Sequence, residues 1–201
     1  MNISNTISSY FPLILTKSFI QIAAFFVMTG IPTLTHAQLE LYTKFNQDGS
    51  LNPVINYNGS KKINDQFALT FFGLIREQWS QALIGISYSP THSVSFSASA
   101  GIEHGQSSPR YSASIWLRNN KTSFLILGEL GSGHENYLYK INMFHEFSEK
   151  FSLGIMDWRY HGLGPNIRYT IPKLQSTIWL MPAYDHEQKI FRNMLGISVR
   201  M

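Results

Sequence analysis

Four histidines stand near turn-forming segments of the chain: His104, His134, His161 and His186. Histidine binds transition metals and acts as a base near neutral pH, and Asp185 and Glu187 flank His186 with carboxylates. The spacing of these side chains matches no metal motif. We therefore expect solvated histidines in turns, with no metal, no cofactor and no assigned catalytic residue. An enzyme that uses such groups on lipid or peptide remains an alternative.

Nine ionisable residues are the strongest candidates for a polar site, because sequence alternation places them on the polar side of their segments. They are Glu103, Arg110, Arg118, Glu129, Lys140, Glu146, Arg168, Arg192 and Arg200. Both signs of charge are present. If these rows face an enclosed interior, the groups either pair with one another or line a water-filled path.

The segments that carry these charges alternate with a period of two residues, which is the period of a β-strand. In residues 93–103, Val94, Phe96 and Ile102 share one face, while serines and Glu103 share the other. Turn residues divide the chain into about twelve such strands, although ten would also fit, with a bulge near residues 157–159. The predicted strands are 38–46, 51–58, 66–76, 79–89, 93–103, 109–119, 121–131, 135–146, 150–160, 165–172, 175–184 and 188–201.

Alternation does not show which face meets water, and a soluble barrel or sandwich would share it. Only 14% of the residues are charged, against about 25% in ordinary soluble proteins. The polar rows are rich in Ser, Asn and Gly, and aromatic residues recur near strand ends, as in a membrane-interface girdle. We therefore predict an all-β, antiparallel up-and-down transmembrane β-barrel with the four histidine turns at one rim. The predicted girdle comprises Tyr42, Trp79, Tyr88, Tyr111, Tyr137, Tyr160, Tyr169 and Tyr184.

The N-terminal segment has the pattern of a secretory signal peptide. Lys17 precedes an uncharged stretch with an apolar centre, and Thr35-His36-Ala37 supplies small residues for cleavage. We predict a signal peptide over 1–37 and a barrel domain over 38–201, with a retained membrane anchor as the alternative. The chain contains no cysteine, which excludes a lipoprotein anchor and a disulfide framework.

The last seven residues alternate up to the chain terminus, with Gly196, Val199 and Met201 at spaced positions. This segment resembles the C-terminal strand of bacterial outer-membrane β-barrel proteins, although that class usually ends in an aromatic residue. The resemblance implies a Gram-negative origin, a location in the outer membrane, contact with its lipids and insertion by the barrel assembly machinery. It does not imply a solute or substrate.

The charge pattern limits the functions to consider. The formal net charge is +4, but the basic residues are scattered and Lys61-Lys62 is their only adjacent pair, so we expect no binding to nucleic acid. We expect a small pore or a structural barrel with a charged or polar lumen. Besides the enzyme that acts at the outer rim, barrels for exopolysaccharide export or surface interactions remain as alternatives.

Overall fold

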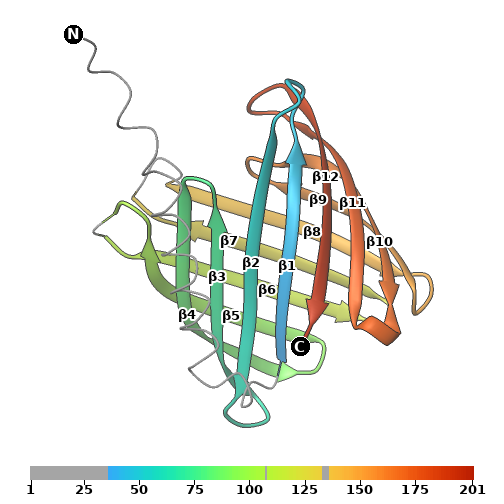
Figure 1. Cartoon of the computed structure of the whole chain (residues 1–201). Coiled ribbons are helices and arrows are strands. Elements are labelled where there is room, and N and C mark those ends of the chain that lie inside the picture. Colours follow the sequence, from blue (N-terminus) through green and yellow to red (C-terminus); the bar gives the residue numbers. More distant parts are fainter. Residues whose placement is uncertain (1–35, 107, 133–135) are drawn as a thin grey trace. The chain divides into compact units, whose positions relative to one another are not determined.

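The computed structural model describes residues 36–106, 108–132 and 136–201. They form a closed barrel of twelve antiparallel strands, in which each strand pairs with its sequence neighbours and β1 pairs with β12 (Figure 1). The strands are β1 (His36–Phe45), β2 (Leu51–Lys62), β3 (Phe67–Arg76), β4 (Trp79–Thr91), β5 (Val94–Glu103), β6 (Arg110–Asn119), β7 (Thr122–Leu130), β8 (Tyr137–Glu146), β9 (Phe151–Trp158), β10 (Gly162–Ile171), β11 (Ser176–Asp185) and β12 (Ile190–Arg200).

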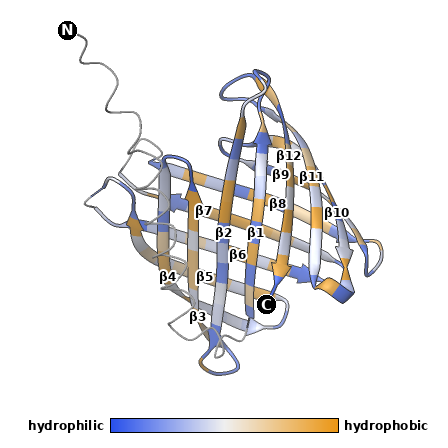
Figure 2. Cartoon of the chain, in the orientation of Figure 1, coloured by the Kyte–Doolittle hydropathy of each residue, from blue (hydrophilic) through white to orange (hydrophobic). Residues whose placement is uncertain are grey.

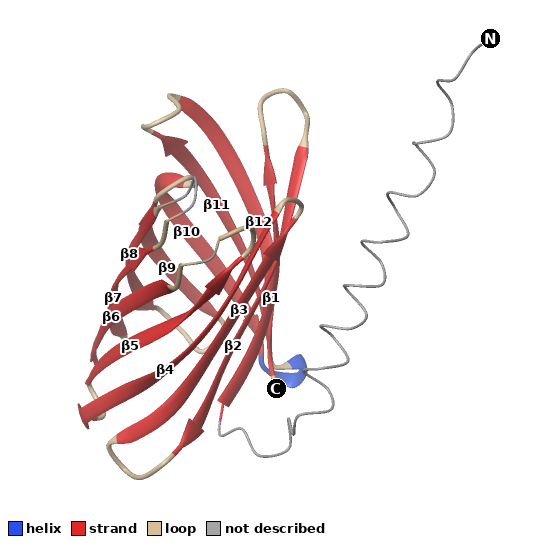
Figure 3. Cartoon of the chain, turned by 90° about the vertical axis from the view of Figure 1, so that its left-hand side faces the viewer, coloured by secondary structure: helices blue, strands red, loops and turns tan. Residues whose placement is uncertain are grey.

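The prediction of twelve antiparallel strands is confirmed. The strands run obliquely around the barrel, joined by short turns and one 3-10 turn at Pro172–Leu174 (Figure 3). Within the described residues, no helix is long and apolar enough to cross a bilayer. We call the end where β1 begins and β12 finishes the terminal end, and the opposite end the distal end.

The turn between β9 and β10 differs from the prediction. It occupies residues 159–161, and residues 162–164, which lay between the predicted strands 150–160 and 165–172, belong to β10. Tyr160 and Gly162 supply the positive φ angles of 65° and 101° that this tight turn requires. The bulge predicted near residues 157–159 is wrong, since β9 keeps one register with both neighbours up to Trp158, whereas the register shifts between Tyr88 and Thr91.

The outer wall of the barrel is apolar, as the strand alternation predicted. Phe96, Ile115 and Ile126 are between 40% and 44% exposed, and Ile102 is 69% exposed. Figure 2 shows hydrophobic residues distributed along the strands of the wall. Because the sheet is closed, none of the twelve described strands leaves a row of unpaired backbone groups at an edge.

The predicted aromatic girdle is only partly correct. Five of its members are outward-facing and exposed: Tyr88, Tyr111, Tyr137, Tyr169 and Tyr184. Tyr42 is 4% exposed and packs inside the barrel, and Trp79 also packs against the interior cluster. Tyr160 lies in the β9–β10 turn and lines a cavity. An aromatic residue near a strand end suits a membrane interface and a barrel interior equally well. A prediction from residue type alone therefore placed these three residues wrongly.

An apolar cluster fills part of the interior. Its most buried members are Met181 and Met194, which have no exposed surface, and around them lie Tyr42, Trp158 and Trp179. Tyr42 comes from β1, and its ring lies 5.7 Å from Trp158 of β9 and 5.5 Å from Trp179 of β11. The lumen is therefore not lined by polar groups alone, which differs from the expected charged or polar lumen.

The C-terminal strand closes the barrel. β12 pairs with β1 from Gln38↔Arg200 to Phe45↔Asn193, and the backbone N–H of Met201 donates to the carbonyl of Ala37 at 2.9 Å. The first strand begins at His36, two residues before the predicted mature start at Gln38. Residues 1–35 lie outside the described part of the chain, so cleavage after Ala37 stays a prediction.

Candidate functional site: the barrel lumen

Three cavities lie along the lumen. The terminal cavity, of about 560 Å³, extends from His36 near the terminal end to Trp79 and Trp158. Two distal cavities, of about 490 and 500 Å³, share the lining residues Lys44 and Arg76. The interior thus holds solvent-sized space at both ends of the apolar cluster.

The terminal cavity combines serines with two cations. Ser97, Ser99, Ser112 and Ser114 from β5 and β6 line one wall. Lys140 Nζ lies 4.2 Å from the Trp158 ring centroid. The Cζ atom of Arg168 lies 3.8 Å from the Phe144 ring centroid, and its Nε donates to Asn166 at 3.0 Å. These aromatic contacts hold both cations in fixed positions against the cavity wall.

Two carboxylates line this cavity, Glu40 and Glu129, and Glu129 is paired with Arg110. Glu40 accepts hydrogen bonds from neutral donors. Trp179 Nε1 donates to Glu40 Oε1 at 2.9 Å, and Asn56 Nδ2 donates to Glu40 Oε2 at 2.9 Å. Among the described residues, no carboxylate lies within ion-pair distance of Lys140 or Arg168. The terminal cavity therefore presents two cations whose charge no direct ion pair neutralises, which suits attraction of an anion.

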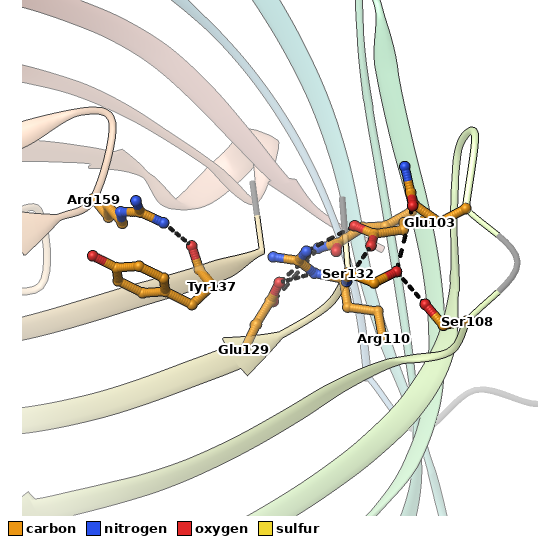
Figure 4. Close-up of polar contacts among 9 residues, drawn as sticks. Glu103, Ser108, Arg110, Glu129, Ser132, Tyr137 and Arg159 are labelled. Atoms are coloured by element: carbon orange, nitrogen blue, oxygen red, sulfur yellow. Dashed lines mark hydrogen bonds and ion pairs between the residues drawn. The ribbon is translucent and has the colours of Figure 1, made fainter. Parts of the chain in front are cut away.

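An ion network fills the lumen near the distal end of β5, β6 and β7 (Figure 4). Arg110 has no exposed side-chain surface, and its Nη1 and Nε lie 2.8 Å from Glu103 Oε2 and 2.9 Å from Glu129 Oε2. Gln81 Nε2 donates to Glu129 Oε2 at 3.2 Å, and the backbone N–H of Ser132 donates to Glu103 Oε1 at 3.1 Å. One arginine therefore joins two buried carboxylates, and neighbouring donors fix both of them.

The other predicted lumen residues lie apart from this network. Arg118 of β6 pairs with Glu146 at 3.0 Å near the terminal end, where the two side chains are 42% and 48% exposed. Arg200 is exposed at the end of β12. Arg192 lies near the distal end, with its Nε 3.4 Å from Asp185 Oδ2. The nine residues therefore form several separate groups rather than one charged row.

His161 is the exception among the predicted rim histidines, because it is buried inside the barrel. Its ring stacks on Trp158 with centroids 3.6 Å apart and planes 6° apart. Nδ1 donates to the carbonyl of Arg159 at 3.1 Å, so Nε2 accepts from the Tyr42 hydroxyl at 3.1 Å. Burial holds the pKa of His161 well below its usual value, and the positive charge of Lys44 acts in the same direction. The expectation of a solvated turn residue is therefore wrong here.

The remaining rim histidines do not converge. His104 is exposed and lines a distal cavity, and His186 Nε2 lies 3.2 Å from the Tyr139 hydroxyl. His134 lies outside the described residues. The hydroxyl of Ser132, a serine in a distal turn, has hydrogen bonds with Ser108 and Gln106. Within the described part of the chain, no three His, Asp or Glu side chains are placed to hold a metal ion.

The residues that sequence reasoning missed are the inward-facing apolar ones and the cations Lys44 and Arg76, whereas Lys140 and Arg168 were among the nine predicted lumen residues. Trp79 shares its side of β4 with Gln81 and Ser87, and Tyr42 shares its side of β1 with Glu40 and Lys44. This shared parity was the available signal. An aromatic residue on a polar row of a membrane strand faces the lumen rather than the interface.

The arrangement of strands is that of a known class of protein. The chain is similar to solved structures of the KdgM porin, with a TM-score of 0.58, 11% identity and coverage of 81% of this chain and 98% of that one. A KdgM porin structure in complex with disordered oligogalacturonate gives a TM-score of 0.57 at 11% identity, covering 82% and 98%. The NanC porin gives 0.52 at 9% identity, covering 80% and 97%. The fold is that of the small bacterial outer-membrane porins.

Sequence comparisons add nothing to this fold relationship. No family model and no curated protein matches the chain.

Proposed function

We propose that this chain is a small outer-membrane pore for polar solutes, with a preference for anions and with its distal end toward the cell exterior. The observation that carries the proposal is the inside-out arrangement of the barrel. Its wall exposes Phe96, Ile115 and Ile126, while the terminal cavity holds Lys140 and Arg168 without a direct ion pair. A soluble barrel would place these two kinds of residue the other way round.

The apolar wall supports a location in the outer membrane. Lipid acyl chains would contact the exposed residues, and barrel closure satisfies the backbone groups that hydrocarbon could not. The C-terminal residues Gly196, Val199 and Met201 would be read by the barrel assembly machinery after export through the periplasm. This route would place the chain termini at the periplasmic side, with the distal turns outside.

The preference for anions is supported by the charges along the lumen. Lys44 and Arg76 line both distal cavities, and Lys140 and Arg168 line the terminal one. A KdgM porin has been solved with oligogalacturonate, a polyanion. For this chain we propose small carboxylate-bearing solutes as the class. Cations outnumber carboxylates in the lining of both distal cavities, and Lys140 and Arg168 have no direct ion pair in the terminal one, so these positions favour an anion.

Ion selectivity in planar bilayers tests this function. The refolded barrel should produce stepwise conductance, with a reversal potential in a KCl gradient that shows anion preference. The double variant Lys140→Gln with Arg168→Gln should lower the anion/cation permeability ratio by about two-fold or more. Arg118→Gln is the matched control, because Arg118 is paired with Glu146 near the terminal end. Absence of conductance, or an unchanged ratio in the double variant, would contradict the proposal.

A further inference from the structure

One residue at the edge of the apolar cluster borders both the terminal cavity and a distal cavity. The terminal cavity and the distal cavity beside β3 and β4 have a single lining residue in common, Trp79. The second distal cavity shares no lining residue with the terminal cavity. We infer that Trp79 is the gate residue of the lumen, and that its indole sets the size of solute that can pass. This inference rests on the proposed pore function.

One side of the lumen around Trp79 is closed by stacked side chains. Lys140 of β8 lies over the Trp158 ring, Trp158 stacks on His161, and His161 accepts a hydrogen bond from Tyr42 of β1. In the closed order of twelve strands, β8 and β1 are five positions apart, and opposite strands are six apart. This row therefore reaches almost from one wall of the barrel to the other.

The other side is closed by the ion network. Arg110 lies between Glu103 and Glu129, and Gln81 of β4 donates to Glu129 of β7. These contacts join β4 to β7 through buried side chains. Opening a path there would require breaking ion pairs of side chains that are at most 4% exposed, so this side is unsuited to the passage of a solute.

Trp79 lies between these two closed regions and is less firmly fixed than either of them. Its ring centroid is 5.2 Å from the Cζ atom of Arg110 and 5.1 Å from the Cζ atom of Arg76. It is the first residue of β4, directly after the turn at Glu77 and Gln78, and it is only partly buried. A rotation of this side chain would join the distal and terminal cavities without breaking the ion network or the stacked row.

Replacing the indole tests the inference. Trp79→Ala should raise single-channel conductance by about two-fold or more, because the narrowest section of a pore dominates its resistance. It should also admit larger neutral sugars in liposome swelling. Trp79→Val, which places a side chain of high strand propensity at the start of β4, should have the same effect and controls for a folding defect in the alanine variant. Trp116→Ala is the matched control, because Trp116 lines only the terminal cavity. Heat-modifiable gel migration should show that each variant is folded.

The four combinations of results separate the gate from the pore. A conducting wild type with larger conductance in both Trp79 variants supports both proposals. A conducting wild type with unchanged Trp79 variants overturns the gate and leaves the pore standing. A silent wild type with conducting Trp79 variants contradicts the pore as proposed and supports Trp79 as the residue that closes the lumen. Absence of conductance in the wild type and in all of the folded variants overturns both proposals. An equal gain of conductance in Trp116→Ala overturns the gate alone.

Discussion

The buried arginine of the ion network gives the sharpest test of what holds the barrel together. Arg110→Met would leave Glu103 and Glu129 as two carboxylates without their cation, in side chains that are 0% and 4% exposed. Removing one partner of a buried ion pair typically costs about 3–5 kcal/mol, because the remaining charge stays desolvated. Since a folded domain is stable by about 5–15 kcal/mol, we expect this single change to remove a large part of the free energy of unfolding.

Urea unfolding of the refolded barrel in lipid, followed by tryptophan fluorescence, would measure the effect. Adding Glu103→Gln and Glu129→Gln to Arg110→Met should recover more than half of the loss, because the amides keep their hydrogen bonds and remove the charge. Arg118→Met on the same strand should cost less than about 1 kcal/mol, since its ion pair with Glu146 is solvated. Equal losses for Arg110→Met and Arg118→Met, or no recovery in the triple variant, would refute the role assigned to desolvated charge.

Three further predictions concern the histidine, the wall and the C-terminal strand. Because the pKa of His161 is lowered in the folded barrel, the unfolded chain binds the proton first, so the free energy of unfolding should fall by up to about 1.4 kcal/mol per pH unit below pH ~6.5. Equilibrium unfolding from pH 7.5 to 5 should show this slope, and His161→Gln should reduce it. Ile115→Lys should cost about 2–4 kcal/mol in lipid, whereas Ser114→Lys, which faces the terminal cavity, should cost much less in the same urea titration. Gly196→Ala should cost about 1–3 kcal/mol in thermal or urea unfolding, because its Cβ would lie 2.4 Å from the Trp179 ring, and a stability equal to wild type would contradict that packing.

The outer wall was the most predictable part of the barrel. Alternation around Phe96 and Ile115 identified the strands, and the low share of charged residues identified the apolar face as the exposed one. Glu103, Arg110 and Glu129 were also expected on the inward rows. Their assembly into one network depends on the pairings Gly101↔Arg110 and Ser112↔Glu129, and strand alternation does not specify the register.

The apolar interior was the least predictable part. Met181 and Trp179 lie on β11, where the inward positions are almost as apolar as the outward ones, so parity with polar residues gives little signal on that strand. His161 lies inside the barrel because the turn occupies residues 159–161. The glycines and the proline that follow had suggested a turn further along the chain. A small error in a turn thus moved a buried histidine to the rim.

Gly196 has two roles, one in the C-terminal motif and one in the packing of the barrel interior. It belongs to the terminal motif proposed for recognition during membrane insertion, and it also lies under the Trp179 ring, where any larger residue would displace the indole. A defect in biogenesis after replacing this glycine would therefore not distinguish failed recognition from a misfitted interior. Val199 and Met201 lie beyond the paired Trp179, so substitutions there would isolate the recognition step from internal packing.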